Sequence, residues 1–526
     1  MTPRRHRLVG LVALATVVAA GCTSTNTSGA PAASGSGANT PATGTTGRAS
    51  YASAPCPNPV LPGVPAANLG TEFTCGYLTV PENRSKPDRP TIRLAVARLK
   101  AASVKPQADP VVFLSGGPGS SAIAQATTIA GLGINADRDV IFVEQRGNYW
   151  SEPRLVCPEV DAFAATAVTK NLSDPATRQQ SKAATTACRD RLASTGVDLA
   201  SYNSAENARD IADLRVAMGI GEWNLYGVSY GTDLALTVLR DHPAGIRSVV
   251  LDSVAPPNVN IFTEFWPAAA AGYRSMFDAC AAQPACATAY PNLADEFATT
   301  VNRLTTTPVT VPVKDPVTGE TVQVHINGYE LANLVVNMTG LHTKIPEIPG
   351  IIHELANGDG TKAATWIHAF VPPPGISGSG LTFGVFCREF VAQSSPEQVL
   401  ARAKQALPKF PDAVFELTPQ VPWFFDICGV WNVGTAPPTA RAPVVSDVPV
   451  LMLVGTFDAI TAVAFTDAVA PGLKRSQTVP IPGAGHQTIT SGPCPVSVMN
   501  AFLAKPTDPV ERTCVDNLAP PTFTTR

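Results

Sequence analysis

The sequence predicts an α/β protein with a mostly parallel sheet of eight strands, helices on both faces of the sheet, and a mostly helical insertion. Short apolar, β-branched runs recur along the chain, and helical patterns separate most of them. The later runs are apolar throughout, as strands covered on both faces are. With 526 residues, 45% hydrophobic and 15% charged, the chain can bury a large core.

The eight expected strands begin with a hairpin. Residues 75–81 and 91–99 flank a turn-rich stretch, so we expect them to pair antiparallel. The remaining strands are expected at 109–117, 138–147, 223–229, 246–254, 448–458 and 476–486. The long interval before the last two predicts an inserted unit.

The first 21 residues have the pattern of a secretion signal. An apolar run at 8–20, too short to span a bilayer, follows the basic residues Arg4, Arg5 and Arg7. The stretch "AAGC", 19–22, resembles the lipobox of bacterial lipoproteins, so we expect a lipid such as palmitate on Cys22. Residues 22–50 are small and polar and are expected to form a flexible tether. Ordinary secretion with cleavage nearby is the alternative.

The cysteines also indicate export. Without Cys22, ten of the eleven remain, an even number that suits disulfide pairing in an oxidising compartment. No CxxC or Cys/His cluster with metal-site spacing occurs, so we expect no metal. Sequence leaves the connectivity open; our hypothesis pairs nearest neighbours in order: Cys56–Cys75, Cys157–Cys188, Cys280–Cys286, Cys387–Cys428 and Cys494–Cys514.

The stretch "WNLYGVSYGTDLAL", 223–236, places a serine between two glycines where a strand gives way to a helix. A turn this tight strains the backbone of its apex residue, Ser229, and leaves room only for small residues two positions before and after. Gly227 and Gly231 meet that need, and the hydroxyl stands near the positive helix N-terminus. The pattern predicts a nucleophile; a glycine-rich turn with a solvated serine is the alternative.

A nucleophilic serine needs a histidine base and an acid that orients it. Of seven histidines, His486 lies in a glycine-rich loop directly after a strand, so we assign it as the base, with a surface-loop histidine as the alternative. Asp458 follows the preceding strand in "GTFDAIT" and is expected to be the acid. Asp252 is the rival, which we expect instead to pin the loop that enters the inserted region.

The oxyanion formed on the substrate needs backbone N–H donors, one after the nucleophile and one from a second loop. Tyr230 supplies the first. The stretch "FLSGGPGSS", 113–121, supplies the second through Gly116 or Gly117, where glycine lets the backbone approach a substrate. A phosphate-binding loop is the competing interpretation, but no Lys-Ser/Thr follows.

These motifs belong to a longer pattern, formed by "GGPG" at 116–119, "EQRGNYWSEP" at 144–153, "NSAENARDIADLRVAMGI" at 203–220, "GVSYGT" at 227–232, "LDSVAPP" at 251–257, "GTFDAIT" at 455–461, "GAGH" at 483–486 and "CPVSVMNAFLAKPTDPVERTC" at 494–514. Through residues 51–526 the chain resembles the α/β-hydrolase superfamily, in its branch of proline iminopeptidases and exported, tripeptidyl aminopeptidase-like lipoproteins. Ser115, Glu144 and "NYW" depart from that pattern, which bears on the shape of the pocket.

The resemblance implies a hydrolase core in two parts, 51–256 and 441–526, with a mostly helical cap at 257–440. The cap's own patterns agree. A helical apolar stripe comprises Leu293, Phe297, Val301 and Leu304; a hairpin is expected at 309–326 and a short helix at 348–360. By the resemblance, the acidic cap residue Glu389 would hold the substrate's amino group; a surface or salt-bridged glutamate is the alternative.

Together these features predict an exported serine hydrolase, held at the outer face of the cell membrane, that cleaves peptides without a cofactor. Aminopeptidase action of tripeptidyl or prolyl type is favoured, and an esterase or lipase with the same triad is the second hypothesis. A non-enzymatic binding protein is the third. With a net charge of −3, nucleic acid is not an expected partner. The oligomeric state is left open.

Overall fold

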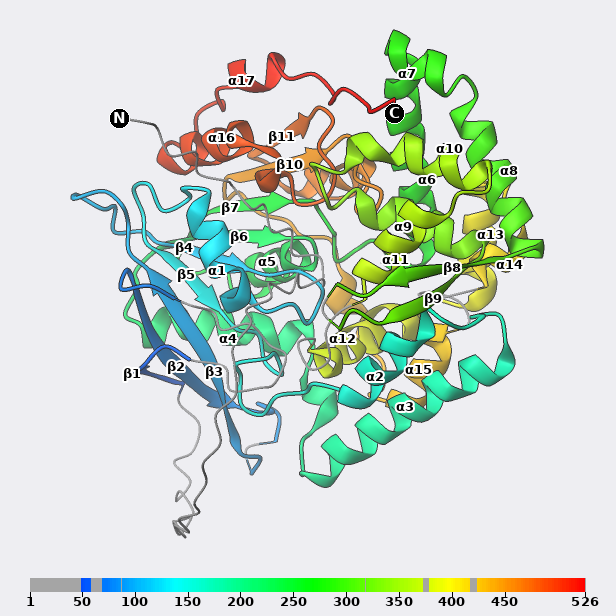
Figure 1. Cartoon of the computed structure of the whole chain (residues 1–526). Coiled ribbons are helices and arrows are strands. Elements are labelled where there is room, and N and C mark those ends of the chain that lie inside the picture. The colour runs from blue at the N-terminus through cyan, green and yellow to red at the C-terminus, as the bar shows by residue number, and fades with distance from the viewer. Residues whose placement is uncertain are drawn as a thin grey trace, which may run out of the picture.

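A computed structural model describes residues 49–57, 69–86, 88–316, 318–371, 378–416 and 423–525. The described residues form a central sheet of nine strands in the order β1-β2-β3-β5-β4-β6-β7-β10-β11 (Figure 1). These strands are β1 (Ser50–Ala54), β2 (Phe73–Pro81), β3 (Thr91–Leu99), β4 (Val111–Leu114), β5 (Val140–Val143), β6 (Trp223–Val228), β7 (Ile246–Asp252), β10 (Val450–Gly455) and β11 (Ser476–Ile481). All eight expected strands are present.

The additional strand, β1, brings the number of strands in this sheet to nine, where eight were expected. It pairs antiparallel with β2, with Ser50 opposite Thr79 and Ala54 opposite Cys75. Its sequence, "SYASA", is small, polar and mostly exposed, so it carries no hydrophobic alternation. This strand forms through backbone pairing at the sheet edge, so its side-chain pattern does not predict it.

The central part of the sheet is parallel. Six strands run the same way, in the spatial order β5, β4, β6, β7, β10 and β11, whereas β1, β2 and β3 pair antiparallel. Every residue of β4, β5, β6 and β10 is buried. The carboxyl ends of the parallel strands therefore meet along one edge, where sheets of this kind place their ligands.

Helices cover both faces of the sheet (Figure 1). On one face, α4 (Ser204–Ala217) and α5 (Tyr230–Asp241) pack against side chains such as Leu114, Leu225 and Val454. On the other face, α1 (Ala122–Gly131) and α16 (Pro493–Ala504) pack against the alternate set, such as Phe113, Tyr226 and Leu453. The period of two in each strand thus divides its side chains between two cores.

Residues 257–440, which we call the inserted segment, lie between β7 and β10 and have a core of their own. They form α6 (Ile261–Ala281), α7 (Pro284–Ala289), α8 (Leu293–Thr306), β8 (Val309–Lys314), β9 (Thr321–Ile326), α9 (Gly328–Met338), α10 (Ile348–Ala356), α11 (Thr361–Ala369), α12 (Ser379–Val385), α13 (Pro396–Ala406), α14 (Asp412–Phe415) and α15 (Trp423–Trp431). A π-helical turn, 386–390, follows α12. The expected stripe of α8 is buried, and the expected hairpin is present as β8–β9.

Another segment joins this side of the molecule. The helices α2 (Pro158–Ala167) and α3 (Pro175–Ser194), held together by the Cys157–Cys188 disulfide, lie beside α15 (Figure 1). The rings of Phe163 and Trp423 are 6.0 Å apart, and Arg178 forms an ion pair with Asp426. The inserted segment therefore packs against residues that precede β6, and the boundaries 51–256, 257–440 and 441–526 stay predictions.

Five disulfides link the cysteine pairs that the nearest-neighbour hypothesis names. This density of disulfides is typical of proteins that fold in an oxidising compartment. None of the helices in the described ranges has the length and apolar character needed to cross a membrane. The expected signal peptide, 1–21, the lipidation site Cys22 and all but the end of the tether lie outside the described residues.

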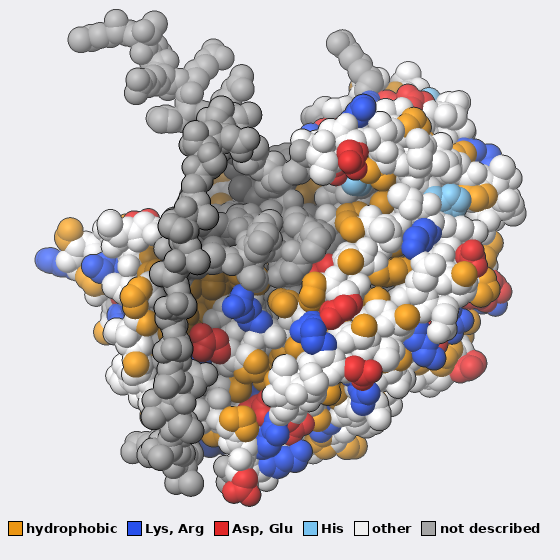
Figure 2. All heavy atoms as spheres, turned by 60° about the horizontal axis from the view of Figure 1, so that its bottom comes forward, with side chains coloured by type: hydrophobic (Ala, Val, Ile, Leu, Met, Phe, Trp, Pro, Cys, Tyr) orange, Lys and Arg blue, Asp and Glu red, His pale blue; other side chains and the backbone are white. Residues whose placement is uncertain are grey.

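Basic and acidic side chains are interspersed over the described surface on the face in Figure 2. This mixed pattern accords with the small net charge of the chain, −3. Within the described ranges, no cluster of three or more His, Cys, Asp and Glu side chains is placed to bind a metal ion.

Candidate active site

Ser229 forms the apex of the turn between β6 and α5. Its backbone has φ 56° and ψ −127°, a conformation that costs a non-glycine residue about 1–3 kcal/mol. The turn is held from both sides, since the Ser229 N–H donates to the Asp252 carbonyl at 3.0 Å and the Ser229 carbonyl accepts the Thr232 N–H at 2.8 Å. Strain maintained by such bonds is characteristic of a functional position.

The two glycines of the turn are required by close backbone contacts. A Cβ on Gly227 would lie 2.2 Å from the Gly231 carbonyl oxygen, and one on Gly231 would lie 2.0 Å from the Leu114 carbonyl oxygen. Neither distance is compatible with a side chain, and in both cases the obstacle is backbone. The predicted reason, collision with the turn, is confirmed for Gly227, whereas at Gly231 the obstacle is the end of β4.

Asp458 and His486 meet at the carboxyl edge of the sheet, in the loops after β10 and β11. The His486 Nδ1 is 2.9 Å from the Asp458 Oδ2. Thr461 donates its hydroxyl to the same oxygen at 2.7 Å, and the N–H groups of Ile460 and Thr461 donate to Oδ1 at 2.8 Å. The carboxylate is thereby fixed in an orientation that holds the imidazole with Nδ1 facing it.

The electrostatics of this pair favour the charged forms. Burial alone raises the pKa of Asp458, but the charge of His486 and the hydrogen bonds from His486 and Thr461 outweigh it, so the pKa lies below its ordinary value. Burial lowers the pKa of His486, but the Asp458 carboxylate outweighs that effect and raises the pKa. The pair is thus prepared to stabilise an imidazolium.

The other ring nitrogen of His486 has no hydrogen-bond partner among the described residues. The side chain is 1% exposed, and its Nε2 is a buried, unpaired polar atom. A buried polar atom left unpaired is costly, and in a native protein it calls for a functional reason. This nitrogen is therefore available for proton transfer.

Asp252 ties the His486 loop to the strand end beside Ser229. Its carboxylate accepts the N–H and hydroxyl of Thr488, at 2.8 and 2.6 Å, and the N–H of Ile489 at 3.1 Å. Its carbonyl accepts the Ser229 N–H. The expectation that Asp252 pins the loop entering the inserted region is wrong, because its bonds go to the segment after His486. Its rival role as the acid is not supported either, since His486 Nδ1 faces Asp458.

The inserted segment braces the same loop, which the sequence did not reveal. The Thr339 carbonyl, just after α9, accepts the His486 N–H at 3.1 Å. His342 accepts the Gly485 N–H at its Nδ1, 3.2 Å away, and its Nε2 lies 3.1 Å from the Gln487 carbonyl oxygen. These contacts join residues more than 100 positions apart, so no local pattern could announce them.

The glycine-rich loop after β4 lies directly against Ser229. A Cβ on Gly116 would lie 2.8 Å from the Ser229 Cβ and 3.3 Å from its Oγ. Gln145 holds the loop by donating to the Ser115 carbonyl at 2.8 Å, and Glu144 accepts the Ile123 N–H at 2.8 Å. Burial raises the pKa of Glu144 to about 7. The loop thus brings backbone close to the Ser229 hydroxyl, as a donor site for an oxyanion requires.

A cavity of about 170 Å³ opens beside Ser229. Its walls come from the turn itself, the glycine-rich loop, the loop after β10, α5, α6, the π-helical turn and α15. They are mostly apolar and are formed by Gly117, Ser229, Tyr230, Asp233, Ala255, Ile261, Phe262, Phe265, Phe386, Phe390, Phe424, Ile460 and Thr461. The inserted segment therefore supplies most of the aromatic surface that a substrate would meet.

The cavity contains one carboxylate, Asp233, that the sequence reasoning missed. It stands one helical turn after Ser229 and is 3% exposed. The available signal in the sequence is its position, because Asp233 is the fourth residue of the helix that begins directly after Ser229. Asp233 begins the otherwise apolar stretch "DLALTVL", and from the sequence alone it resembles a residue on the exposed, polar face of a helix.

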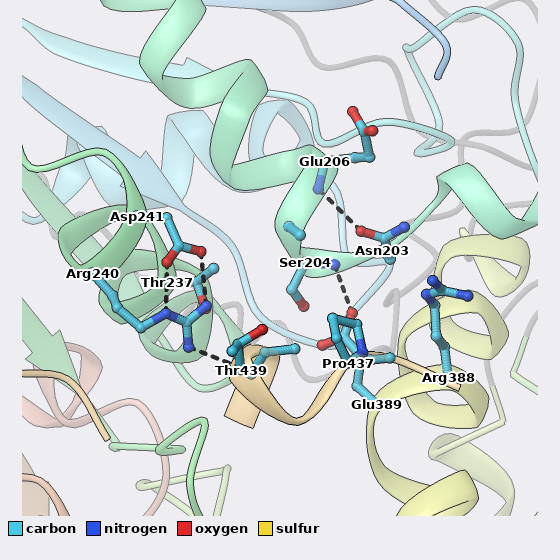
Figure 3. Close-up of a pocket in the computed structure, with 13 residues that line it drawn as sticks. Asn203, Ser204, Glu206, Thr237, Arg240, Asp241, Arg388, Glu389, Pro437 and Thr439 are labelled. Atoms are coloured by element: carbon cyan, nitrogen blue, oxygen red, sulfur yellow. Dashed lines mark hydrogen bonds and ion pairs between the residues drawn. The ribbon is translucent and has the colours of Figure 1, made fainter. Parts of the chain in front are cut away.

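Glu389 occupies a different place from the one expected. It lines a separate cavity of about 270 Å³, with Asn203, Arg240 and Arg388 (Figure 3). It is 6% exposed, so it is not a surface residue, and it accepts the Ser204 N–H at 2.7 Å. The Ser204 hydroxyl lies 2.8 Å from the Tyr230 hydroxyl. The structure does not bring Glu389 into the cavity of Ser229, and substrate binding by it stays a prediction.

Two family models match this chain. The first, described as alpha/beta hydrolase fold, matches residues 109–345, and the second, described as TAP-like protein, matches residues 418–514. Together they span more than half of the chain. The first includes Ser229 and the glycine-rich loop, and the second includes Asp458 and His486.

Two of the curated relatives are named as peptidases. Tripeptidyl aminopeptidase of Streptomyces coelicolor is 31% identical over 198 residues, and serine protease Hip1 of Mycobacterium tuberculosis is 26% identical over 201 residues. The alignments span 36% and 35% of this chain and only 37% and 36% of these relatives. A crystal structure of proline iminopeptidase from Mycobacterium smegmatis matches 82% of this chain and 98% of its own, at 17% identity and a TM-score of 0.36.

The strand order, the strained turn at Ser229 and both family matches agree. This chain has the α/β-hydrolase fold: residues 109–345 belong to the family of that name, and residues 418–514 match the TAP-like proteins.

Proposed function

We propose that this protein is an extracytoplasmic serine hydrolase that cleaves peptides through an acyl-enzyme, with aminopeptidase action of tripeptidyl or prolyl type. The observation that carries the proposal is the Asp458–His486 pair. The His486 Nε2 has no partner in the part of the chain that the structure describes, and Asp252 ties the His486 loop to the turn of Ser229. The naming of the relatives as peptidases supports the choice of substrate.

In this mechanism His486 Nε2 takes the proton of the Ser229 hydroxyl as its oxygen attacks the scissile carbonyl carbon. Asp458 stabilises the imidazolium, which then gives its proton to the leaving amine. Water then attacks the acyl carbonyl carbon, with His486 as the base. The imidazolium returns the proton to the Ser229 oxygen as the acid product leaves. The N–H groups of Gly116 or Gly117 and of Tyr230 would receive the oxyanion, a role worth about 2.7–4 kcal/mol per donor in other serine hydrolases.

The disulfides and the N-terminal sequence support the proposed location. Five disulfides favour an oxidising compartment. The basic and apolar start and the lipobox-like "AAGC" support cleavage before Cys22 and anchoring by a lipid on that residue. Mass spectrometry of the mature N-terminus tests this part directly; an unmodified start within the body of the chain contradicts it.

Ester hydrolysis is the second candidate. The apolar lining of the cavity favours it, because the same walls can receive an acyl chain, and the same catalytic groups cleave esters. The non-enzymatic hypothesis has the least support, since the acid, base and serine all stand at one sheet edge.

A fluorophosphonate probe tests the nucleophile. We expect labelling of Ser229 in the folded wild type and none in Ser229→Ala. Peptide p-nitroanilides and short acyl esters then separate the two candidates, and a peptide library read by mass spectrometry gives the cleavage position. The aminopeptidase proposal is contradicted if the enzyme hydrolyses esters faster than peptides and if blocking the peptide's amino group does not change the rate.

A further inference from the structure

Asp233 lies in the first turn of α5, the helix that begins directly after Ser229. The two residues are four positions apart, and both line the 170 Å³ cavity. Asp233 is 3% exposed, so what reaches its carboxylate does so through this cavity. A group bound there lies next to the bond that Ser229 would attack.

The Asp233 carboxylate lacks a good partner within the described part of the chain. The hydrogen bond it receives is a long one, from the Thr237 hydroxyl at 3.5 Å. A buried carboxylate that forms no ion pair is strongly disfavoured in its charged form unless a bound group supplies hydrogen bonds or a positive charge. Burial, and then the negative charge of Glu389, raise the pKa of Asp233 to about 7.

The charges of Arg441 and Arg240 partly offset the raised pKa of Asp233, but the hydrogen bonds of both arginines go to other groups. Arg441 donates to the Val259 carbonyl, and its guanidinium stacks on Phe390, 4.1 Å from the ring centroid. Arg240 pairs with Asp241 at 2.7 Å and donates to the Ala440 carbonyl at 2.9 Å (Figure 3). Neither arginine forms an ion pair with Asp233 among the described residues.

The rest of the cavity suits an organic cation. Aromatic side chains dominate its walls, and several meet edge to face, with Phe262 5.3 Å from Phe386 and 5.1 Å from Phe424 between centroids. Aromatic faces attract ammonium groups and also cover hydrocarbon. One carboxylate among such rings is a combination that recognises a positively charged nitrogen on an apolar stem.

We propose that Asp233 is a specificity-determining residue that binds a substrate ammonium group beside the scissile bond. The inference rests on the proposed function and narrows it to substrates whose residue before the scissile bond carries this charge. The ammonium comes from one of two sources. It is the free α-amino group of the first residue, which makes the enzyme remove single residues, or the side chain of a lysine, whose four-carbon stem lies along the aromatic walls.

Three substrates separate these sources in the wild type: leucine p-nitroanilide, N-acetyl-leucine p-nitroanilide and N-acetyl-lysine p-nitroanilide. We expect kcat/KM for one of the two cationic substrates to exceed that of the neutral one by about tenfold or more. A higher kcat/KM for leucine p-nitroanilide than for N-acetyl-leucine p-nitroanilide identifies the α-ammonium as the bound group. A higher kcat/KM for N-acetyl-lysine p-nitroanilide identifies the lysine side chain. Equal values for all three, within about twofold, overturn the proposal.

Asp233→Asn tests the residue itself, because it keeps the shape and removes the charge. We expect the cationic-to-neutral ratio of kcat/KM to fall about tenfold or more. The ratio cancels differences in intrinsic reactivity between substrates. Asp241→Asn is the matched control, since it removes the same charge from the other end of α5, outside the cavity of Ser229. Its ratio should equal that of the wild type.

Fluorophosphonate labelling of Ser229 is measured on every variant alongside these rates. If wild-type Ser229 is not labelled, the proposed function fails and the inference fails with it. If Ser229 is labelled but Asp233→Asn keeps the wild-type ratio, or changes it no more than Asp241→Asn does, the inference alone is wrong. A variant that does not label is replaced by Asp233→Ser, which is judged by the same ratio.

Discussion

Thr339 in the inserted segment accepts the backbone N–H of His486 at 3.1 Å. The contact is tight on the neighbouring residue as well, because a Cβ on Gly485 would lie 1.7 Å from the Thr339 carbonyl oxygen. The position of the predicted base therefore depends on residues outside the sheet core.

Gly485→Ala should displace the His486 loop, since its added methyl overlaps a backbone oxygen. We expect kcat/KM to fall by about 100-fold or more, the cost of a shift near 1 Å in a catalytic group. Steady-state kinetics and the fluorophosphonate labelling rate measure this. Gly221→Ala is the control, because a Cβ there meets no atom within 4 Å. Equal rates for both variants would contradict the role assigned to the contact.

The pH dependence of kcat/KM should report His486. The base works only when neutral, so activity is lost as the pH falls through its pKa. Because Asp458 raises that pKa, the acid limb should lie above 6.5, the ordinary value of histidine. In Asp458→Asn the limb should move to lower pH, and the maximal rate should fall by about 10⁴-fold. A limb that stays in place in this variant would assign the titration to another group.

Thr461→Val should impair catalysis without changing the acid or the base. The change removes the hydroxyl that lies 2.7 Å from Asp458 Oδ2 and 3.2 Å from His486 Nδ1. We expect kcat to drop about ten- to 100-fold, as for a hydrogen bond to a charged group, and Thr461→Ser to restore most of it. Thr466→Val, which alters a buried threonine bonded to the Val463 carbonyl, is the control. Failure of serine to rescue would indicate a packing role instead.

Removing the Cys387–Cys428 disulfide by double serine substitution should affect both stability and substrate binding. The bridge joins the π-helical turn to α15, which both line the cavity, and closes a separation of 41 residues. Loop-closure entropy predicts a loss of about 4 kcal/mol, against about 2 kcal/mol for Cys280–Cys286 with a separation of 6. Thermal melts should therefore show a larger fall in Tm for the first pair, and kinetics a rise in KM. Equal melting shifts would contradict the entropic argument.

The sequence predicts the sheet, the Ser229 turn and the Asp458–His486 pair because each depends on short-range rules. Gly227 is required by a backbone contact within its own turn, and the acid and base follow strand ends. Gly231 fits the same motif, although the backbone it contacts belongs to Leu114 at the end of β4. Strands that are buried at every position, such as β4 and β10, can be predicted because their residues are almost all apolar.

The missed features depend on contacts between distant segments. β1 is formed by pairing with β2 and has little apolar content of its own. The bonds of Asp252 reach residues more than 200 positions away. Asp233 is locally an ordinary helix residue, and only the packing of α6, the π-helical turn and α15 around it creates the cavity.

The inserted segment is fastened to both halves of the reactive centre. Thr382 donates its hydroxyl to the Pro118 carbonyl at 2.6 Å, and Gly378 donates its N–H to Gly119 at 3.0 Å, while Thr339 holds His486. If the inserted segment moved away from the sheet as a lid, these hydrogen bonds to the glycine-rich loop and to His486 would break. If the proposed activity holds, we expect substrates to reach Ser229 through the aromatic-lined cavity while these contacts stay in place. We therefore expect deletion of the inserted segment to displace the His486 loop and the glycine-rich loop, and so to abolish the proposed activity instead of broadening its specificity.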